Sequence, residues 1–550
     1  MSRRLALALI TLAAGAGLLA AAALGSGARV SSGGIFEVGD TGNLDSVDPA
    51  IANETTSWMF EAATGANLFR DSGGLVIPEV AKRFTVSKNG RVYRFLLRSG
   101  YRFSDGQAVR AASFAYAIKR SLNPDLDSPG GSYIVDQRGL NIVGALRYAA
   151  GRADSVSGVH ASGLSLTIKL VRADPSLLTV LAMPFFQAAS SKLPLTREAI
   201  GVQQVGDLPT AGPYTWSYNA PSQQADIVRN PYYTGTRGRH VDGVELDMRL
   251  DPETCFQETQ ASQLDLGCLP PGHRAAVAQQ NGVSRSKPVG TGRFWIKSSP
   301  VEWTLLFNFR RLFAGNPQLR QAVSWALDRT AMADQIDPYA MTPWTHSIPP
   351  GFPGVVTAQR LQPYSLKPDL AKARQLAVGH MGDGSIHVAY QSEGKAGPLT
   401  AEAVRQALVG LGFDASRIEM RGFSGYDLYT AADTHGTPFD LVVGMGFGVP
   451  MPSADPASFV GEGLVGLGLG DFDPANASYN KAFHILSRTL NGKARLRALG
   501  RFDVRVMKNF APVAVLSVSN DLTFFSDRVD PESLRYSPDY GWSFTALRLK

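Results

Sequence analysis

The sequence predicts an α/β protein built from more than one lobe, and three observations lead to this prediction. Between residues 316 and 509, helical patterns alternate with a short buried strand, which is typical of layered α/β structure. The chain has 550 residues, which exceeds the usual size of a single domain. Its 56 Gly and 33 Pro residues indicate many turns and connections and argue against a helical bundle.

The first 28 residues have the organisation of an export signal. Arg3 and Arg4 precede an apolar stretch from Leu5 to Leu24, and small residues follow up to Ala28. This order is typical of a secretory signal peptide. As a helix, the apolar stretch is also long enough to span a bilayer. Residues 1–28 are therefore a cleaved signal peptide or a retained signal anchor, and we expect the protein in the periplasm or at the cell surface. No cysteine lies near the cleavage region, so we expect no lipoprotein.

The first half of the chain predicts short strands and one clear helix. Asn-Gly at 89–90 separates the β-rich runs 83–86 and 91–97, a pattern that predicts a hairpin. Apolar periodicity predicts a helix over 111–122. Strict alternation of apolar and polar residues over 164–170 predicts a half-buried strand.

The second half of the chain predicts an α/β lobe. Asn316 and Pro317 are favourable residues for a helix start, and an apolar stripe at helical spacing follows up to Leu327. Residues 439–444 predict a buried strand, and the Pro- and Gly-rich residues 341–364 predict a long ordered loop. Further helices are predicted over residues 369–377, 400–411, 479–490 and 494–509.

The only two cysteines, Cys255 and Cys268, lie 13 positions apart. In an oxidising compartment they are a disulfide candidate, and the alternative is a pair of small buried apolar side chains. The eight histidines show no ligand spacing, and two cysteines alone do not make a zinc site. We therefore expect no metal and no cofactor.

Motifs of the common enzyme classes are missing from the sequence. It contains no H-E-x-x-H, no G-x-S-x-G, no Walker loop and no dinucleotide fingerprint. We therefore expect no catalytic residue and no enzymatic activity. The net charge of +7 is not gathered in any run of five or more basic residues, so we expect no nucleic-acid partner.

Several motifs, taken in their order along the chain, are similar to those of one protein family. The most recognisable stretch runs from Asn89 to Gly106 and continues over 111–120. The other motifs are Leu44–Pro49, Leu75–Ala81, Thr210–Tyr214, Arg229–Tyr233, Phe307–Arg329, Ser347–Gly351 and Asp455–Pro456. The ordered set resembles the extracytoplasmic solute-binding proteins of ABC importers for peptides and nickel, the oligopeptide- and dipeptide-binding family.

This resemblance implies a periplasmic-binding-protein-like fold with two lobes and an extra inserted subdomain. The implied parts are a discontinuous lobe I of residues 35–65, 205–280 and 515–550, an inserted subdomain of residues 66–204, and a lobe II of residues 281–514. A ligand would enter the cleft between the lobes, which close by hinge motion. We expect the two hinge crossings near Gly267–Gly282 and Ala511–Asn520.

The resemblance also implies ligand-binding residues in two segments. The first segment follows the Leu-Asp motif and comprises Asn53, Glu54, Thr55 and Thr56. The second is expected as a loop after a strand and comprises Gly444, Met445, Gly446 and Phe447. Glycines in such a loop would let the backbone approach a ligand closely. Phe447 would form an apolar wall of the cleft or, alternatively, belong to the core.

One motif departs from the family pattern. Peptide binders of this family carry an acid that pairs with the amino terminus of the ligand. Counting back from Asp455 places Pro452 at that position. A buried ammonium group would lose its charge partner there, which argues against the usual mode of free-peptide binding. Asp455 itself is expected as a helix or turn cap.

The resemblance implies a monomeric, exported binding protein without a cofactor. It would capture a peptide-like or other small solute and present it to an ABC permease in the membrane. Two alternatives remain open. The first is a membrane-anchored sensor or scaffold that binds a ligand in the same cleft, and the second is a secreted hydrolase.

Overall fold

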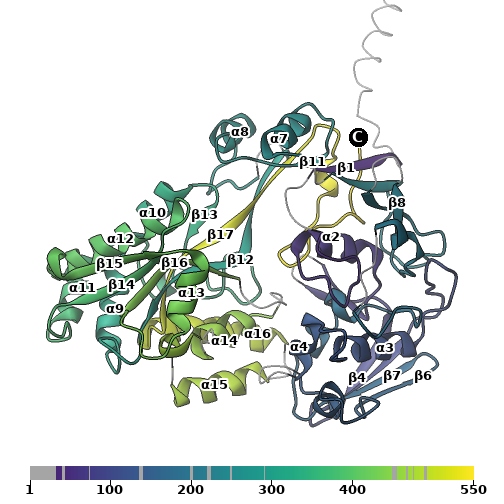
Figure 1. The fold of residues 1–550 in the computed structure, drawn as a ribbon, viewed down its shortest axis with the longest axis horizontal. Coiled ribbons are helices and arrows are strands. Elements are labelled where there is room, and N and C mark those ends of the chain that lie inside the picture. Colours follow the sequence, from purple (N-terminus) through teal and green to yellow (C-terminus); the bar gives the residue numbers. More distant parts are fainter. Residues whose placement is uncertain are drawn as a thin grey trace, which may run out of the picture.

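The computed structural model describes residues 33–39, 44–72, 75–135, 140–197, 202–219, 224–247, 250–289, 292–448, 455–465, 469–474, 476–488 and 492–550. The predicted signal segment 1–28 and Pro452 lie outside these residues. Figure 1 shows two bodies joined through a pair of long strands, β12 (Phe294–Phe307) and β17 (Val513–Phe525). Within the described part of the chain, no helix is long and apolar enough to cross a membrane.

One mixed sheet of 11 strands extends through both bodies. Besides β12 and β17, its strands are β1 (Ile35–Gly39), β8 (Tyr214–Asn219), β9 (Gln224–Arg229), β10 (Gly243–Asp247), β11 (Leu266–Gly267), β13 (Met341–Pro343), β14 (Ile386–Gln391), β15 (Ile418–Phe423) and β16 (Leu441–Gly448). Their order is β15-β14-β16-β12-β17-β11-β1-β10-β9-β8, and β13 also pairs with β17. The central strands β12 and β17 therefore separate β14–β16 on one side from β1 and β8–β11 on the other.

The antiparallel pairing of β12 with β17 is interrupted in the middle. Ser298 pairs with Asn520, but the next regular pair is Glu302 with Val518. The crossing between the two bodies therefore includes residues 294–307. The expected first crossing at Gly267–Gly282 stays a prediction: that span runs from the end of β11, which pairs with β1 and β17, through the helix α8 (Arg274–Asn281), whose Arg274 pairs with Asp337 just after α10. The second expected crossing overlaps β17.

The segment after β1 builds a second, smaller sheet with its own core. Strands β4 (Ala81–Val86), β5 (Val92–Leu97), β7 (Ser165–Lys169) and β6 (Val159–Ser162) follow one another in the order β4-β5-β7-β6, covered by helix α3 (Ala111–Ser121). The side chains of Tyr93, Phe95, Leu166 and Phe114 are buried together. The predicted hairpin at 89–90, the strand near 164–170 and the helix near 111–122 are therefore confirmed.

The body that contains β14–β16 carries most of the long helices. They are α9 (Pro317–Ala326), α10 (Arg329–Ile336), α11 (Leu370–Ala377), α12 (Ala396–Leu411), α13 (Gly425–Asp433), α14 (Ala457–Val465), α15 (Ala477–Ser487) and α16 (Gly492–Asn509). Asn316 caps α9 by accepting the Leu319 N–H at 3.2 Å, as its position predicts. The predicted loop 341–364 differs from the structure, because its first three residues form β13.

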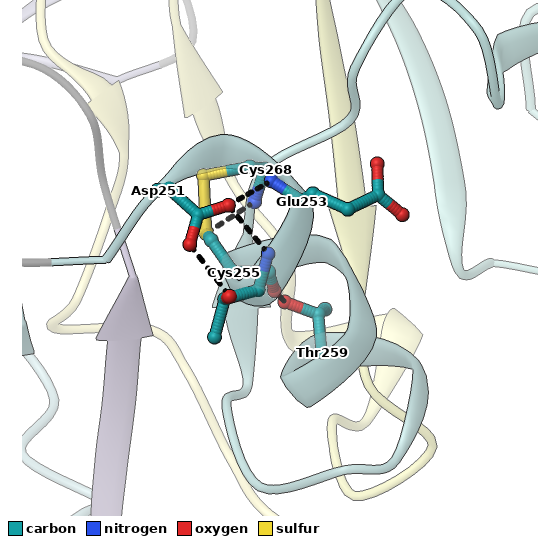
Figure 2. Close-up of a disulfide and its surroundings, with 6 residues drawn as sticks. Asp251, Glu253, Cys255, Thr259 and Cys268 are labelled. Carbon is teal, nitrogen blue, oxygen red and sulfur yellow. Dashed lines mark hydrogen bonds between the residues drawn. A yellow bond between two sulfur atoms is a disulfide. The ribbon is translucent and has the colours of Figure 1, made fainter.

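The shorter elements complete the body around β1. They are α2 (Thr55–Thr64), α4 (Ser132–Val135), α5 (Ala145–Ala149), α6 (Leu177–Val180), α7 (Pro252–Gln260), β2 (Phe69–Asp71), β3 (Val76–Pro78), β18 (Tyr536–Ser537) and β19 (Gly541–Trp542). Figure 2 shows the disulfide between Cys255 on α7 and Cys268, whose Cα atoms are 5.5 Å apart. Asp251 caps α7 through the N–H groups of Glu253 and Thr254. The disulfide fastens α7 to the chain that follows β11.

Candidate functional site

The first predicted ligand segment lies at the start of α2. The Asp45 carboxylate accepts the N–H of Asn53 at 2.8 Å and that of Glu54 at 3.3 Å. Glu54 precedes the helix and makes no side-chain cap. The side chains of Asn53, Glu54 and Thr55 are exposed, whereas Thr56 is buried. Asp45 therefore fixes the backbone of this segment and leaves three of the four predicted side chains accessible to a ligand.

The second predicted segment is not a loop. Residues Gly444 to Phe447 continue β16, whose pairing with β12 shifts between Thr304 and Leu306. At this irregularity Gly444 has a φ of +81°, and a Cβ atom there would lie 2.9 Å from the Cα of Gly397. The expected loop is wrong, because pairing with β12 extends the strand. The glycine at 444 is required by the close approach of α12 and by its left-handed backbone.

Of the rest of this segment, the structure describes the side-chain burial of residues 445 and 446 only, so the expected role of the Phe447 side chain lies outside the described part. Met445 is half-buried and packs against a core cluster that includes Val442, while Gly446 is exposed. A Cβ atom on Gly446 would lie 3.2 Å from the Trp303 ring. The backbone of Phe447 pairs with that of Glu302 on β12. The segment is therefore held from one side by the strand that crosses between the bodies.

The two predicted segments lie in different bodies of the molecule. Figure 1 shows α2 on the side of β1 and β8, and β16 on the side of β14 and β15. The hydrogen bonds given above for residues 53–54 go to Asp45, and those of residues 444–447 go to β12. A ligand that contacts both segments must therefore bridge the two bodies, and the shared site stays a prediction.

Asp455, which follows the position of the missing acid, is a structural residue. Its carboxylate accepts the Ala457 N–H at 3.0 Å and pairs with Arg495 of α16 at 2.8 Å. Both side chains are buried. The expectation that Asp455 acts as a cap agrees with the first of these contacts. Asp174 lies on the loop after β7. Its pKa is raised mainly by burial and also by the negative charge of Asp455. The smaller sheet therefore approaches α14–α16 here.

A polar cavity that sequence reasoning missed lies between α2, β2 and the C-terminal segment. Its volume is about 470 Å³, and its lining includes Glu61, Asn67, Arg237 and Tyr540. Glu61 is buried, and the Gln187 Nε2 donates to its Oε2 at 2.5 Å. Burial raises the pKa of Glu61 well above its usual value, because a buried carboxylate is poorly solvated. The signal in the sequence is one Glu within the apolar pattern of α2.

One buried ion pair lies in the lining of this cavity. Arg237 is buried against Glu79 at 2.8 Å and donates to the carbonyl oxygens of Ala62 and Gly65. These contacts connect the end of α2 to the chain after β9. The cavity therefore lies at the junction between the large and the small sheet, along the same helix α2 at whose start the first predicted ligand segment lies.

A buried ion pair explains two of the recognised motifs. Asp48 of the Leu-Asp motif accepts both terminal nitrogens of Arg120 on α3, at 2.8 and 2.7 Å. Both side chains are nearly inaccessible. The pair joins the first segment of the chain to the smaller sheet. Across the described ranges, no group of three or more His, Cys, Asp or Glu residues is placed to hold a metal ion.

Comparison with curated proteins identifies relatives that bind solutes. The chain is 22% identical over 314 residues to the oligopeptide-binding protein OppA of Bacillus subtilis (strain 168), covering 56% of this chain and 55% of that protein. It is 24% identical over 352 residues to the probable deoxycholate-binding periplasmic protein YgiS of Escherichia coli (strain K12), covering 63% of each. The matches thus span less than two thirds of these relatives.

Solved structures share the fold over nearly the whole chain. The unliganded open form of MppA, a periplasmic murein tripeptide binding protein, has a TM-score of 0.76 at 16% identity and covers 94% of this chain and 98% of that chain. Clavulanic acid biosynthesis oligopeptide binding protein 2 gives 0.76 at 19% identity, with 94% and 96% covered. These likenesses confirm the predicted periplasmic-binding-protein-like fold. The family model of bacterial extracellular solute-binding proteins, family 5 (Middle), matches residues 76–463, and this chain belongs to that family.

Proposed function

We propose that this chain is the exported binding component of an ABC import system. It captures a small solute between its two bodies and presents it to a membrane permease. The observation that carries this proposal is the pair of crossing strands, β12 and β17. They connect the body that contains α2, with its exposed residues 53–55, to the body that contains β16, with residues 444–447.

The crossing strands supply a physical mechanism for ligand capture. Their pairing is regular over residues 294–298 and shifts register twice after that, between Ser298 and Glu302 and between Trp303 and Thr304, so bending should concentrate in this part of the strands. A ligand that contacts both bodies stabilises the closed arrangement in proportion to its extra contacts in that state. The permease then recognises the closed form. No covalent step is needed, so the protein acts as a monomeric carrier and not as an enzyme.

Peptide-like solutes are the ligand class best supported by the relatives. OppA and DppE of Bacillus subtilis are named as oligopeptide- and dipeptide-binding proteins, and YgiS as a probable deoxycholate-binding protein. Pro452 stands at the position where the peptide binders carry the acid that pairs with the amino terminus of the ligand. A ligand with an amino terminus therefore needs another acidic partner in this protein. Glu54 is an exposed carboxylate at the start of α2 and is our candidate for that partner.

Native mass spectrometry of the protein purified gently from its host tests this proposal. We expect an added mass of one small molecule per chain, which denaturation releases for identification. Glu54→Gln removes one charge but keeps the backbone contact with Asp45, so a cationic ligand should bind it at least tenfold more weakly.

The matched control is Asp154→Asn, which removes the same charge at an exposed position on the smaller sheet's side of the molecule. It should bind the released ligand as the natural protein does. Turnover of the released molecule, or the absence of any saturable ligand from host extracts and peptide pools, would contradict the proposal.

A further inference from the structure

The net charge of the chain is concentrated in one helical hairpin. Residues 477–509, which comprise α15, α16 and their connection, contain eight Lys and Arg residues and a single acid, Asp503. Their net charge is therefore +7, which equals the net charge of the whole chain. The other residues together are neutral. Figure 1 shows α15 and α16 as neighbouring helices, and the two pack against each other.

Five of these cations lie along the exposed side of α16. Their spacing of four, four, four and three residues keeps them on one side of an α-helix, in a row about 22 Å long. The other side of the helix, with Leu499, Phe502 and Val506, is buried in a core cluster. We call the five residues the α16 cationic row: Lys493, Arg497, Arg501, Arg505 and Lys508.

The described residues provide no ion pair for this row. Arg495, on the same helix, points inward and pairs with Asp455. The only acid of the hairpin, Asp503, is buried and accepts the N–H groups of Ser347 and Ile348. By contrast, the half-buried Arg405 on α12 pairs with the exposed Glu402 at 2.8 Å. Because like charges four residues apart destabilise a helix, the row is suited to an external anionic partner.

We propose that the α16 cationic row docks onto the anionic headgroups of a phospholipid membrane. A protein partner would require aromatic or apolar anchors at the centre of the contact, and the exposed side of α16 offers only flexible cations. Such a row fits a diffuse layer of phosphates, to which each Lys or Arg adds attraction. On α15, the cation Lys481 and, four residues later, Ile485 are also exposed, the latter to 62%.

This inference goes beyond the proposed function. Adsorption through α16 would concentrate the binding protein at the membrane that holds its permease. It makes no use of the ligand residues 53–56 and 444–447. Ligand binding and membrane docking can therefore fail separately, and each has its own measurement.

Co-sedimentation with vesicles tests the inference. The purified protein is mixed with vesicles of phosphatidylcholine alone or of equimolar phosphatidylcholine and phosphatidylglycerol. We expect binding only to the anionic vesicles, and loss of binding at high salt as charges are screened. The variant Lys493→Gln/Arg497→Gln/Arg501→Gln/Lys508→Gln should bind at least about a hundredfold more weakly, because each cation adds roughly a factor of five.

The matched control removes two Lys and two Arg from exposed positions of the smaller sheet, with the variant Lys82→Gln/Arg83→Gln/Lys88→Gln/Arg94→Gln. It has the same net charge and should retain most of the binding. Two double variants of the row, Lys493→Gln/Arg497→Gln and Arg501→Gln/Lys508→Gln, should each give an intermediate loss with an unchanged circular dichroism spectrum. Equal binding to both kinds of vesicle, no binding to either, or an equal loss in the control would overturn the inference.

Discussion

Arg120 and Asp48 form a buried ion pair that connects the first segment of the chain to α3. Asp48→Asn would leave the guanidinium of Arg120 buried without a charge partner. We expect this variant to lower the free energy of unfolding by about 3–5 kcal/mol. Denaturant titration monitored by tryptophan fluorescence measures the loss.

An exposed pair provides the comparison for this prediction. Asp105 pairs with Lys192, whose side chain is 56% exposed, so Asp105→Asn should cost about 1 kcal/mol or less. In the double variant Asp48→Leu/Arg120→Met both charges are gone, and stability should return toward that of the natural protein. Equal losses for Asp48→Asn and Asp105→Asn would show that burial of the first pair has no energetic effect.

At the scale of elements, α16 holds the loop after β13 through the Asp503 carboxylate. Burial raises the pKa of Asp503 from 3.8 to about 7. Between these values the folded chain retains a proton that the unfolded chain has released. The contribution of Asp503 to stability is therefore greatest below pH 4 and decreases as the pH rises to about 7.

The variant Asp503→Asn removes this titration. Relative to the variant, the natural protein should lose a few kcal/mol of stability between pH 4 and pH 7. His346, whose pKa is lowered to about 4 by burial, has the opposite pH dependence, but it is present in both proteins and cancels in the difference. Thermal unfolding followed at several pH values gives the two curves, and parallel curves would contradict the prediction.

Elements with local signals could be predicted from the sequence. Asn316 caps α9 and Asn89-Gly90 closes a hairpin because short-range backbone chemistry determines both. Strand β16 was predicted too short, because its glycines at 444, 446 and 448 are typical of loops. Its length depends instead on β12, which pairs with it from more than 130 positions earlier in the chain. Such partners are invisible to local patterns.

At the scale of the whole molecule, bending should concentrate where β12 and β17 lose their register. Hydrogen exchange measures this directly. We expect the amide of Ser299, for which the described residues of β16 and β17 provide no pair, to exchange faster than those of 294–298, which pair regularly with 520–524. Binding of the copurified ligand should change exchange at 299–301 and leave 294–298 unaffected. Uniform protection along β12 would contradict a hinge at this place.

The candidate site could be predicted only in part. Residues 53–55 follow a recognisable motif and are exposed, and their role in ligand binding stays a prediction. The polar cavity depends on the contact of Glu61 with Gln187, which are 126 positions apart. A search for runs of basic residues cannot detect the α16 cationic row, because its cations are spaced by helical turns and never form a continuous run. In both cases the fold brings together residues that lie apart in the sequence, through tertiary contacts in the cavity and through helical turns in α16.

The two ends of the described chain meet beside β1. The Arg528 guanidinium donates to the carbonyl oxygen of Ile35, 493 positions away, and Leu549 shares a buried cluster with Phe36. Strand β17, which holds the halves of the sheet together, is also the last strand of this sheet in chain order. The large sheet therefore cannot be completed before residue 525 has been synthesised. A chain with this topology must hold its earlier strands without their central partner until then, which agrees with the export that we propose.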